Sequence, residues 1–116
     1  MKLLIINGPN MNLLGTREPE LYGRRTYSDL IEYIEKGRGS AFGNELSFFQ
    51  SNHEGEIIDC IQNARDSGIQ GIVINGAGYS HTSIAIMDAL KAVGIKTVEV
   101  HITDIEAKRS TENTLI

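Results

Sequence analysis

Short apolar runs alternate with amphipathic stretches along this chain. The unbroken run KLLIIN at 2–7 is typical of a strand that is covered on both faces. Three later runs, ELSFFQS (45–51), GIVIN (71–75) and KTVEVHI (96–102), predict three more strands. We therefore expect four strands separated by longer segments.

The first of these segments has the pattern of a helix that begins after Thr26. Asp29 follows three residues later, which makes a partial capping box. Leu30, Ile31 and Ile34 then form an apolar stripe at helical spacing. The glycine-rich segment 36–44 ends this helix.

Two further helices are predicted before and after the third strand. Ser51 and Glu54 have the spacing of a capping box, and Gly68 ends the helix that follows them. Its expected buried face consists of Ile57, Ile58, Ile61 and Ala64. The last helix covers 84–93 and stops at Gly94.

Strands that alternate with helices predict an α/β fold with a parallel sheet and helices on both faces. We expect residues 1–116 to form a single domain, since the length suits one and no linker or repeat interrupts the chain. In such sheets, ligands bind beyond the carboxyl ends of the strands. The segments of interest are therefore NGPNMN, SNHE, NGAGYSHTS and HITD.

Composition and charge narrow the class of protein. A net charge of −4 argues against a nucleic-acid-binding surface. No apolar run approaches the roughly 20 residues that a membrane helix needs. The single Cys60 excludes an internal disulfide and favours a reducing cytoplasm; it lies in an apolar helical stretch, which indicates a packed thiol rather than a nucleophile.

The segments after the strands are rich in amides and contain all three histidines. They hold Asn7, Asn10, Asn12, Asn52, His53, Asn75, His81 and His101. Each has a simpler explanation: the asparagines as turn residues, His53 as a first-turn helix residue and His81 as a cap. Metal binding is disfavoured because no paired histidine spacing occurs, and no phosphate-binding motif is present.

His101 is harder to explain as a structural residue. The strand pattern places Glu99 and His101 on the same side of the chain. A carboxylate there can orient an imidazole and stabilise its charged form.

The loop TREPELYG at 16–23 places Arg17 and Tyr22 five residues apart between two glycines. A nearby guanidinium lowers the pKa of a phenol and so favours the phenolate, which is a base. A surface loop with incidental residues is the alternative. If the loop closes over a ligand, however, it assembles that base only when it is needed.

Four of these stretches, NGPNMNLLGTREPELYG, FFQSNHEGEIID, INGAGYSHTSIAIMDAL and VEVHITD, closely resemble the type II 3-dehydroquinate dehydratases. The resemblance runs from residue 1 to about residue 104. It implies a flavodoxin-like three-layer sandwich, the reversible dehydration of 3-dehydroquinate to 3-dehydroshikimate in the shikimate pathway, no cofactor, and homo-oligomers (trimers that assemble into dodecamers).

The resemblance also implies roles for residues. Tyr22 is the base, Arg17 keeps it ionised, the Asn10 region stabilises an enolate, His101 is the acid, and Glu99 orients His101. Substrate-holding positions match Asn75, His81 and the backbone amides of Ile102 and Thr103, and Asp88 matches a residue near a subunit contact.

Two departures from the family keep alternatives open. Where the family has a substrate-binding arginine, this chain has Glu112, with Lys108 and Arg109 nearby. The chain also stops at Ile116, before the family's last strand and helix. The alternatives are an impaired relative that only binds a carboxylate ligand, and a flavodoxin-type nucleotide- or flavin-binding module.

Overall fold

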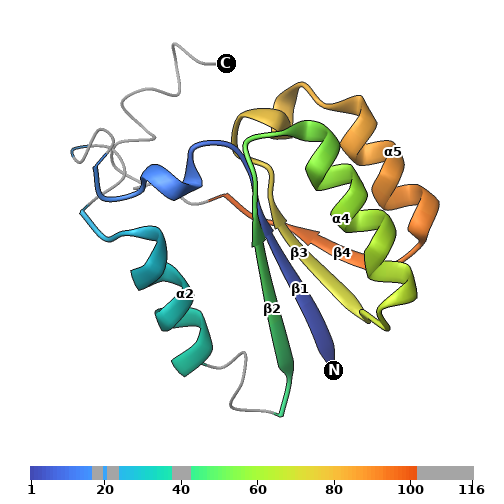
Figure 1. Ribbon diagram of the computed structural model, residues 1–116, viewed down its shortest axis with the longest axis horizontal. Coiled ribbons are helices and arrows are strands. Elements are labelled where there is room, and N and C mark those ends of the chain that lie inside the picture. Colours follow the sequence, from blue (N-terminus) through green and yellow to red (C-terminus); the bar gives the residue numbers. More distant parts are fainter. Residues whose placement is uncertain (17–19, 21–23, 38–42, 102–116) are drawn as a thin grey trace.

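A computed structural model of the protein describes residues 1–16, 20, 24–37 and 43–101 (Figure 1). Its elements in chain order are β1 (Lys2–Asn7), η1 (Met11–Leu13), α2 (Tyr27–Lys36), β2 (Glu45–Gln50), α4 (Glu54–Asp66), β3 (Gly71–Asn75), η2 (Ala77–His81), α5 (Ile84–Val93) and β4 (Lys96–Glu99), where η denotes a 3-10 turn.

The four strands form one parallel sheet in the order β2-β1-β3-β4. This confirms the predicted α/β fold and its strand sequence. The chain moves from β1 to β2 on one side and then returns to β3 on the other, so the topological switch point lies between β1 and β3. Asn7 and Asn75, the last residues of those two strands, are paired in the sheet.

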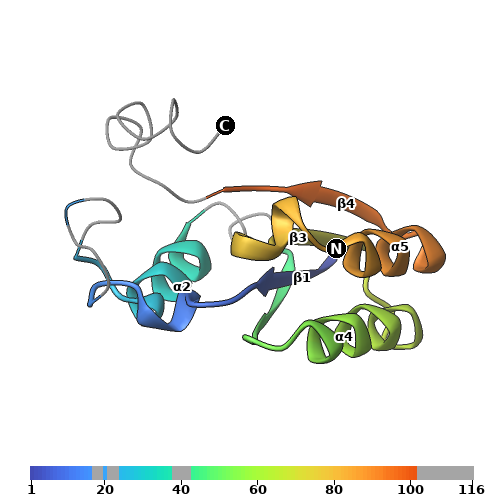
Figure 2. The same ribbon diagram turned by 90° about the horizontal axis from the view of Figure 1, so that it is seen from above.

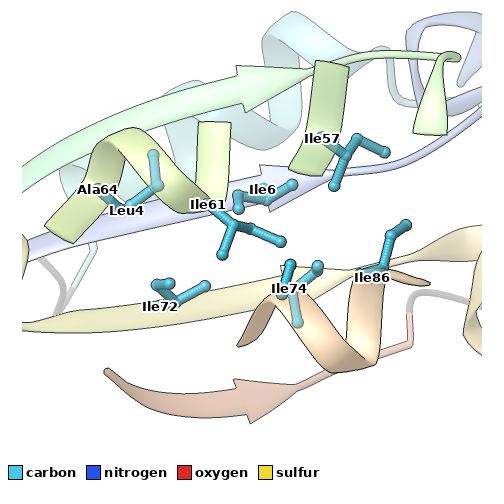
Figure 3. Packing of buried hydrophobic residues seen from close by; sticks show 9 residues of the cluster. Leu4, Ile6, Ile57, Ile61, Ala64, Ile72, Ile74 and Ile86 are labelled. Atoms are coloured by element: carbon cyan, nitrogen blue, oxygen red, sulfur yellow. The ribbon is translucent and has the colours of Figure 1, made fainter. Parts of the chain in front are cut away.

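Helices lie on both sides of the sheet, with α4 and α5 together on one side and α2 on the other (Figures 1 and 2). The core lies on the side of α4 and α5. Ile6, Ile57, Ile61 and Ile72 are its most deeply buried side chains, and Figure 3 shows these isoleucines of strands and helices packed against each other. Burying each such side chain stabilises the fold by about 1.5–3 kcal/mol.

Helix α2 begins as predicted. The Thr26 hydroxyl accepts from the Asp29 N–H at 3.1 Å, and the Asp29 carboxylate accepts from the Thr26 N–H at 2.9 Å, which is a complete capping box. No residue of α2 is fully buried, however, and its apolar stripe is only half-buried. The stable packing of the described chain therefore comes from the α4 and α5 side.

The predicted Ser51–Glu54 capping box is wrong. Helix α4 begins at Glu54, with His53 in the N-cap position and without a side-chain cap. The Ser51 hydroxyl instead accepts from the His53 N–H at 2.9 Å and donates to the Glu56 carboxylate. The serine sits two residues too early to cap α4, so it organises the turn before the helix.

The fourth strand is shorter than predicted, since β4 ends at Glu99 rather than at residue 102. One more ladder bond follows, from the Val100 N–H to the Ile74 carbonyl at 2.9 Å. The last residue pair of this ladder joins Ile74 to Glu99, and Asn75, which ends β3, pairs only with Asn7 of β1. His101 therefore follows the strand instead of lying within it. The expected lack of a fifth strand and final helix concerns residues outside the described ranges.

Candidate active site

The loops that follow β1 and β3 approach each other closely at the switch point. The Gly8 N–H donates to the Asn75 carbonyl at 2.8 Å. A Cβ atom on Gly8 would lie 2.5 Å from the Gly76 carbonyl oxygen, so only glycine fits there. This contact brings the amides of the first loop next to those of the third.

Asn75, with 3% of its surface exposed, is buried where the two loops meet. Its Oδ1 accepts from the Ala77 N–H at 3.1 Å, which shapes the start of η2. Its Nδ2 donates to the Met11 sulfur at 3.4 Å. A thioether is a weak acceptor, so this buried amide N–H retains capacity for a better partner.

Asn7, the strand partner of Asn75, anchors the start of α2. It is 2% exposed, and its Nδ2 donates to the Tyr27 hydroxyl at 3.4 Å. Tyr27 is the first residue of α2. This hydrogen bond connects the switch point to α2, the helix that follows segment 16–23 in the chain.

Asn10 adopts a left-handed backbone conformation, with φ 69° and ψ 0°. Asparagine tolerates this region better than most residues, which supports part of the turn explanation. The Asn10 side chain is nevertheless exposed at the carboxyl edge of the sheet. A left-handed turn at this place directs the chain into η1, whose Met11 is buried below it.

Asn52 connects three of the edge segments. Its Oδ1 accepts from the Asn10 N–H at 2.9 Å and from the Gln50 side chain at 3.3 Å. Its backbone carbonyl accepts from the Tyr79 hydroxyl at 3.2 Å. Gln50 also donates to the Gly8 carbonyl at 3.2 Å. The loops after β1, β2 and β3 therefore form one hydrogen-bonded unit.

A second polar link joins the two core helices. The Ser83 hydroxyl caps α5 by accepting from the Ile86 N–H at 3.0 Å, and it donates to Glu54 Oε2 at 2.6 Å. Ser83 is buried at 6% exposure. This contact fixes the start of α5, and hence the end of η2, relative to the start of α4.

Glu99 and His101 lie together, as the strand pattern predicted. Glu99 Oε1 is 3.5 Å from His101 Nε2, and both side chains are a little under half exposed. Glu99 and Tyr79 also line a cavity of about 270 Å³ between α5 and the carboxyl ends of β3 and β4. The carboxylate can therefore orient the imidazole at the rim of this edge.

The structure brings together some of the predicted site residues. Asn10 and Asn75 share the switch-point junction, and Glu99 pairs with His101. Asp88 is exposed on α5 and does not join the network in the part of the chain that is described. Arg17, Tyr22, Ile102 and Thr103 lie outside the described residues, and only the backbone of His81, the last residue of η2, is described.

Sequence reasoning missed several residues that hold the site together: Asn52 as a hub, Gln50, Ser83 and Glu54. In the sequence, Asn52 stands out only as a polar residue after β2. The position of Asn52 directly after a strand was the only signal that it could belong to the site. Its hydrogen-bond partners depend on the order of the strands in the sheet. Gln50 falls inside a strand, so nothing in the local pattern separates it from an ordinary polar position.

Two other sequence expectations concern reactive or metal-binding groups. Burial raises the pKa of the Cys60 thiol, which agrees with a packed thiol rather than a nucleophile. Within the described ranges, no group of three or more His, Cys, Asp or Glu side chains could hold a metal ion, and no helix is long and apolar enough to cross a membrane.

Comparison with known proteins assigns the family. The model of the family "Dehydroquinase class II" matches residues 1–114. A 3-dehydroquinate dehydratase from Caldicellulosiruptor saccharolyticus is 56% identical over 107 residues, which cover 92% of this chain and 73% of that protein.

Solved structures agree with this assignment. The type II dehydroquinase from Butyrivibrio crossotus superposes with a TM-score of 0.84 at 50% identity, over 88% of this chain and 70% of that one. The type II dehydroquinase from Propionibacterium acnes gives 0.79 at 39% identity, over 91% and 72%. The chain thus spans about seven-tenths of the length of these relatives. It belongs to the class II dehydroquinase family.

Proposed function

We propose that this protein is a 3-dehydroquinate dehydratase, a lyase that converts 3-dehydroquinate reversibly to 3-dehydroshikimate and water in the shikimate pathway. The observation that carries the proposal is the family match over residues 1–114, and the pairing of Glu99 with His101 after β4 supports it. No cofactor enters the proposed reaction.

The reaction begins with removal of a proton from carbon 2, next to the ketone. Tyr22 takes this proton as a phenolate, and Arg17 holds the phenol in that ionised form by its positive charge. The electron pair moves onto the ketone oxygen and gives an enolate. The amides of the Asn10 loop, with an ordered water, stabilise this oxygen.

The second step expels the hydroxyl group as water. His101 donates a proton to the departing oxygen as the enolate collapses to the conjugated enone. Glu99, 3.5 Å from His101 Nε2, orients the imidazole. A positioned acid of this kind contributes on the order of 10²–10⁴-fold in rate.

Substrate binding follows from the remaining edge residues. A substrate hydroxyl is a better acceptor for the Asn75 Nδ2 than the Met11 sulfur it contacts here. His81 and the backbone amides of Ile102 and Thr103 are proposed to hold the substrate's polar groups and carboxylate. Asp88, exposed on α5, is proposed to take part in substrate binding near a contact between subunits of a homo-oligomer, either a trimer or a dodecamer. The single cysteine supports a cytoplasmic location.

An absorbance assay for the conjugated enone tests the function. The wild-type chain should produce the enone from 3-dehydroquinate. Tyr22→Phe should abolish turnover, whereas Tyr33→Phe, a matched change at a tyrosine that is 71% exposed on α2, should leave it unchanged.

Full activity of Tyr22→Phe would refute the assignment of the base. A folded wild-type chain that makes no product would contradict the proposed function. The impaired, ligand-binding alternative, suggested by Glu112 in place of the family's arginine, would then replace it.

A further inference from the structure

We infer that Asn52 is a positioning residue for the reaction, which sets the backbone of Asn10 through a side-chain hydrogen bond. This inference rests on the proposed function for its kinetic consequence, but not for its structural one. Asn52 lies between β2 and α4, on a different loop from any residue assigned to the chemistry. Its role is to hold other groups rather than to touch the substrate.

Asn10 has an uncommon backbone conformation. A non-glycine residue at φ 69° is held in a sparsely populated region and needs its surroundings to keep it there. The Asn52 Oδ1 accepts from the Asn10 N–H at 2.9 Å, which is good geometry for a hydrogen bond. This bond fixes the peptide plane that precedes the Asn10 side chain, and hence the direction in which that side chain leaves the backbone.

Asn52 is itself held on two sides. The Gln50 side chain donates to the same Oδ1 at 3.3 Å, and the Tyr79 hydroxyl donates to the Asn52 carbonyl at 3.2 Å. Tyr79 belongs to η2, directly after Asn75 and Gly76. Asn52 therefore links the loop that carries Asn10 to the segment that follows Asn75.

The side chain of Asn52 positions Asn10 but adds little to the stability of the fold. Asn52 is exposed and contributes nothing to the apolar core. Removing its side-chain acceptor leaves the Asn10 N–H accessible to water, so the fold loses little. Water does not fix the loop, however, and small misplacements of a group near reacting atoms cost large factors in rate. The predicted loss therefore appears in kcat more than in KM or in stability.

The experiment compares Asn52→Leu, which keeps the size but removes the acceptor, with Asn52→Asp, which keeps an acceptor oxygen. Asn63→Leu, at an exposed position on α4, is the matched control. Steady-state kinetics with 3-dehydroquinate and hydrogen exchange of the Asn10 amide, measured by NMR, are the two readouts.

We expect Asn52→Leu to lower kcat roughly tenfold, the value of one hydrogen bond, and to speed exchange of the Asn10 amide by a similar factor. Asn52→Asp should restore both, and Asn63→Leu should change neither. Tyr79→Phe, which removes only the second anchor, should lower kcat by a smaller factor, about threefold.

If the Asn10 amide exchanges at an unchanged rate in Asn52→Leu, the Asn52 side chain does not hold the Asn10 backbone. Unchanged kcat with faster exchange would overturn its role in the reaction. If the wild-type chain makes no enone, the proposed function has failed. The exchange measurement still decides whether the Asn52 side chain holds the Asn10 backbone. If Asn52→Leu does not fold, Asn52 is a structural residue and not a positioning residue. A wild-type kcat in Tyr79→Phe would then show that the hydrogen bond from the Tyr79 hydroxyl does not position Asn52 either.

Discussion

Replacing Gly8 by alanine should separate the two loops of the switch point and reveal how much the site depends on their contact. The new Cβ would lie 2.5 Å from the Gly76 oxygen, 2.8 Å from the Gly76 carbonyl carbon and 3.3 Å from the Asn75 oxygen. All three are backbone atoms, so no side-chain rotation can relieve the overlap.

The size of the effect follows from these distances. To reach ordinary van der Waals separation, at least about 3.4 Å, the Gly76 carbonyl must move away by nearly 1 Å. The hydrogen bond from the Gly8 N–H to the Asn75 carbonyl, 2.8 Å long, would then exceed hydrogen-bonding distance. Overpacking costs about 1–3 kcal/mol, and the lost bond adds about 1 kcal/mol, so we expect a loss of about 2–4 kcal/mol in the free energy of unfolding.

Gly55→Ala is the matched control. Gly55 lies in the first turn of α4, and a Cβ there would meet nothing within 4 Å. Alanine favours the helix over glycine by about 0.5–1 kcal/mol, so this variant should be more stable than the wild type. The same change therefore has opposite signs at the two positions.

Urea denaturation followed by circular dichroism measures both changes, and the enone assay measures their effect on turnover. Gly8→Ala should lower kcat by more than tenfold, because a shift of about 1 Å misplaces Asn10 against Asn75. Wild-type stability and wild-type kcat in Gly8→Ala would refute the close approach of the loops.

Three further predictions concern the core, the acid and the thiol. Ile61→Ala should lower the free energy of unfolding by about 2–5 kcal/mol, because Ile61 is fully buried. Ile84→Ala, at a side chain 84% exposed, should lower it by less than about 0.5 kcal/mol. Equal losses of the two variants in denaturation would contradict the described core. His101→Ala should lower kcat by on the order of 10²–10⁴-fold in the enone assay. His53→Ala, at the N-cap of α4, should change kcat by less than about twofold. An equal loss of kcat at both positions would refute the assignment of His101 as the acid. Burial raises the pKa of the Cys60 thiol, so the folded protein keeps its proton at pH values where the unfolded chain loses it; unfolding free energy should therefore fall as pH rises above the ordinary thiol value of about 8.5, and Cys60→Ser should flatten that fall.

The fold could be predicted because its signals are local. An unbroken apolar run identified β1, a capping pair fixed the start of α2, and the isoleucine spacing of α4 identified its buried face. The Ser51–Glu54 capping box failed because two alternative geometries share the same spacing. Ser51, two residues before the cap position, serves the turn instead, and only the actual start of the helix separates the two geometries.

The candidate site was only partly predictable. The Glu99–His101 pair follows from strand alternation within four residues, so the sequence contains the needed information. Asn52 becomes a hub because β1 lies between β2 and β3, which places its loop beside two others. That placement depends on strand order, and strand order is a property of the whole sheet rather than of any local pattern.

In the proposed reaction, a phenol, an imidazole and the switch-point amides act on one substrate. A crystal structure with a non-reactive analogue of 3-dehydroquinate bound tests it most directly. We predict that the analogue lies beyond the carboxyl ends of β1 and β3, with Tyr22, Asn75 and His101 all turned toward it. An analogue bound elsewhere, or a Tyr22 hydroxyl or His101 imidazole turned away from it, would contradict the account.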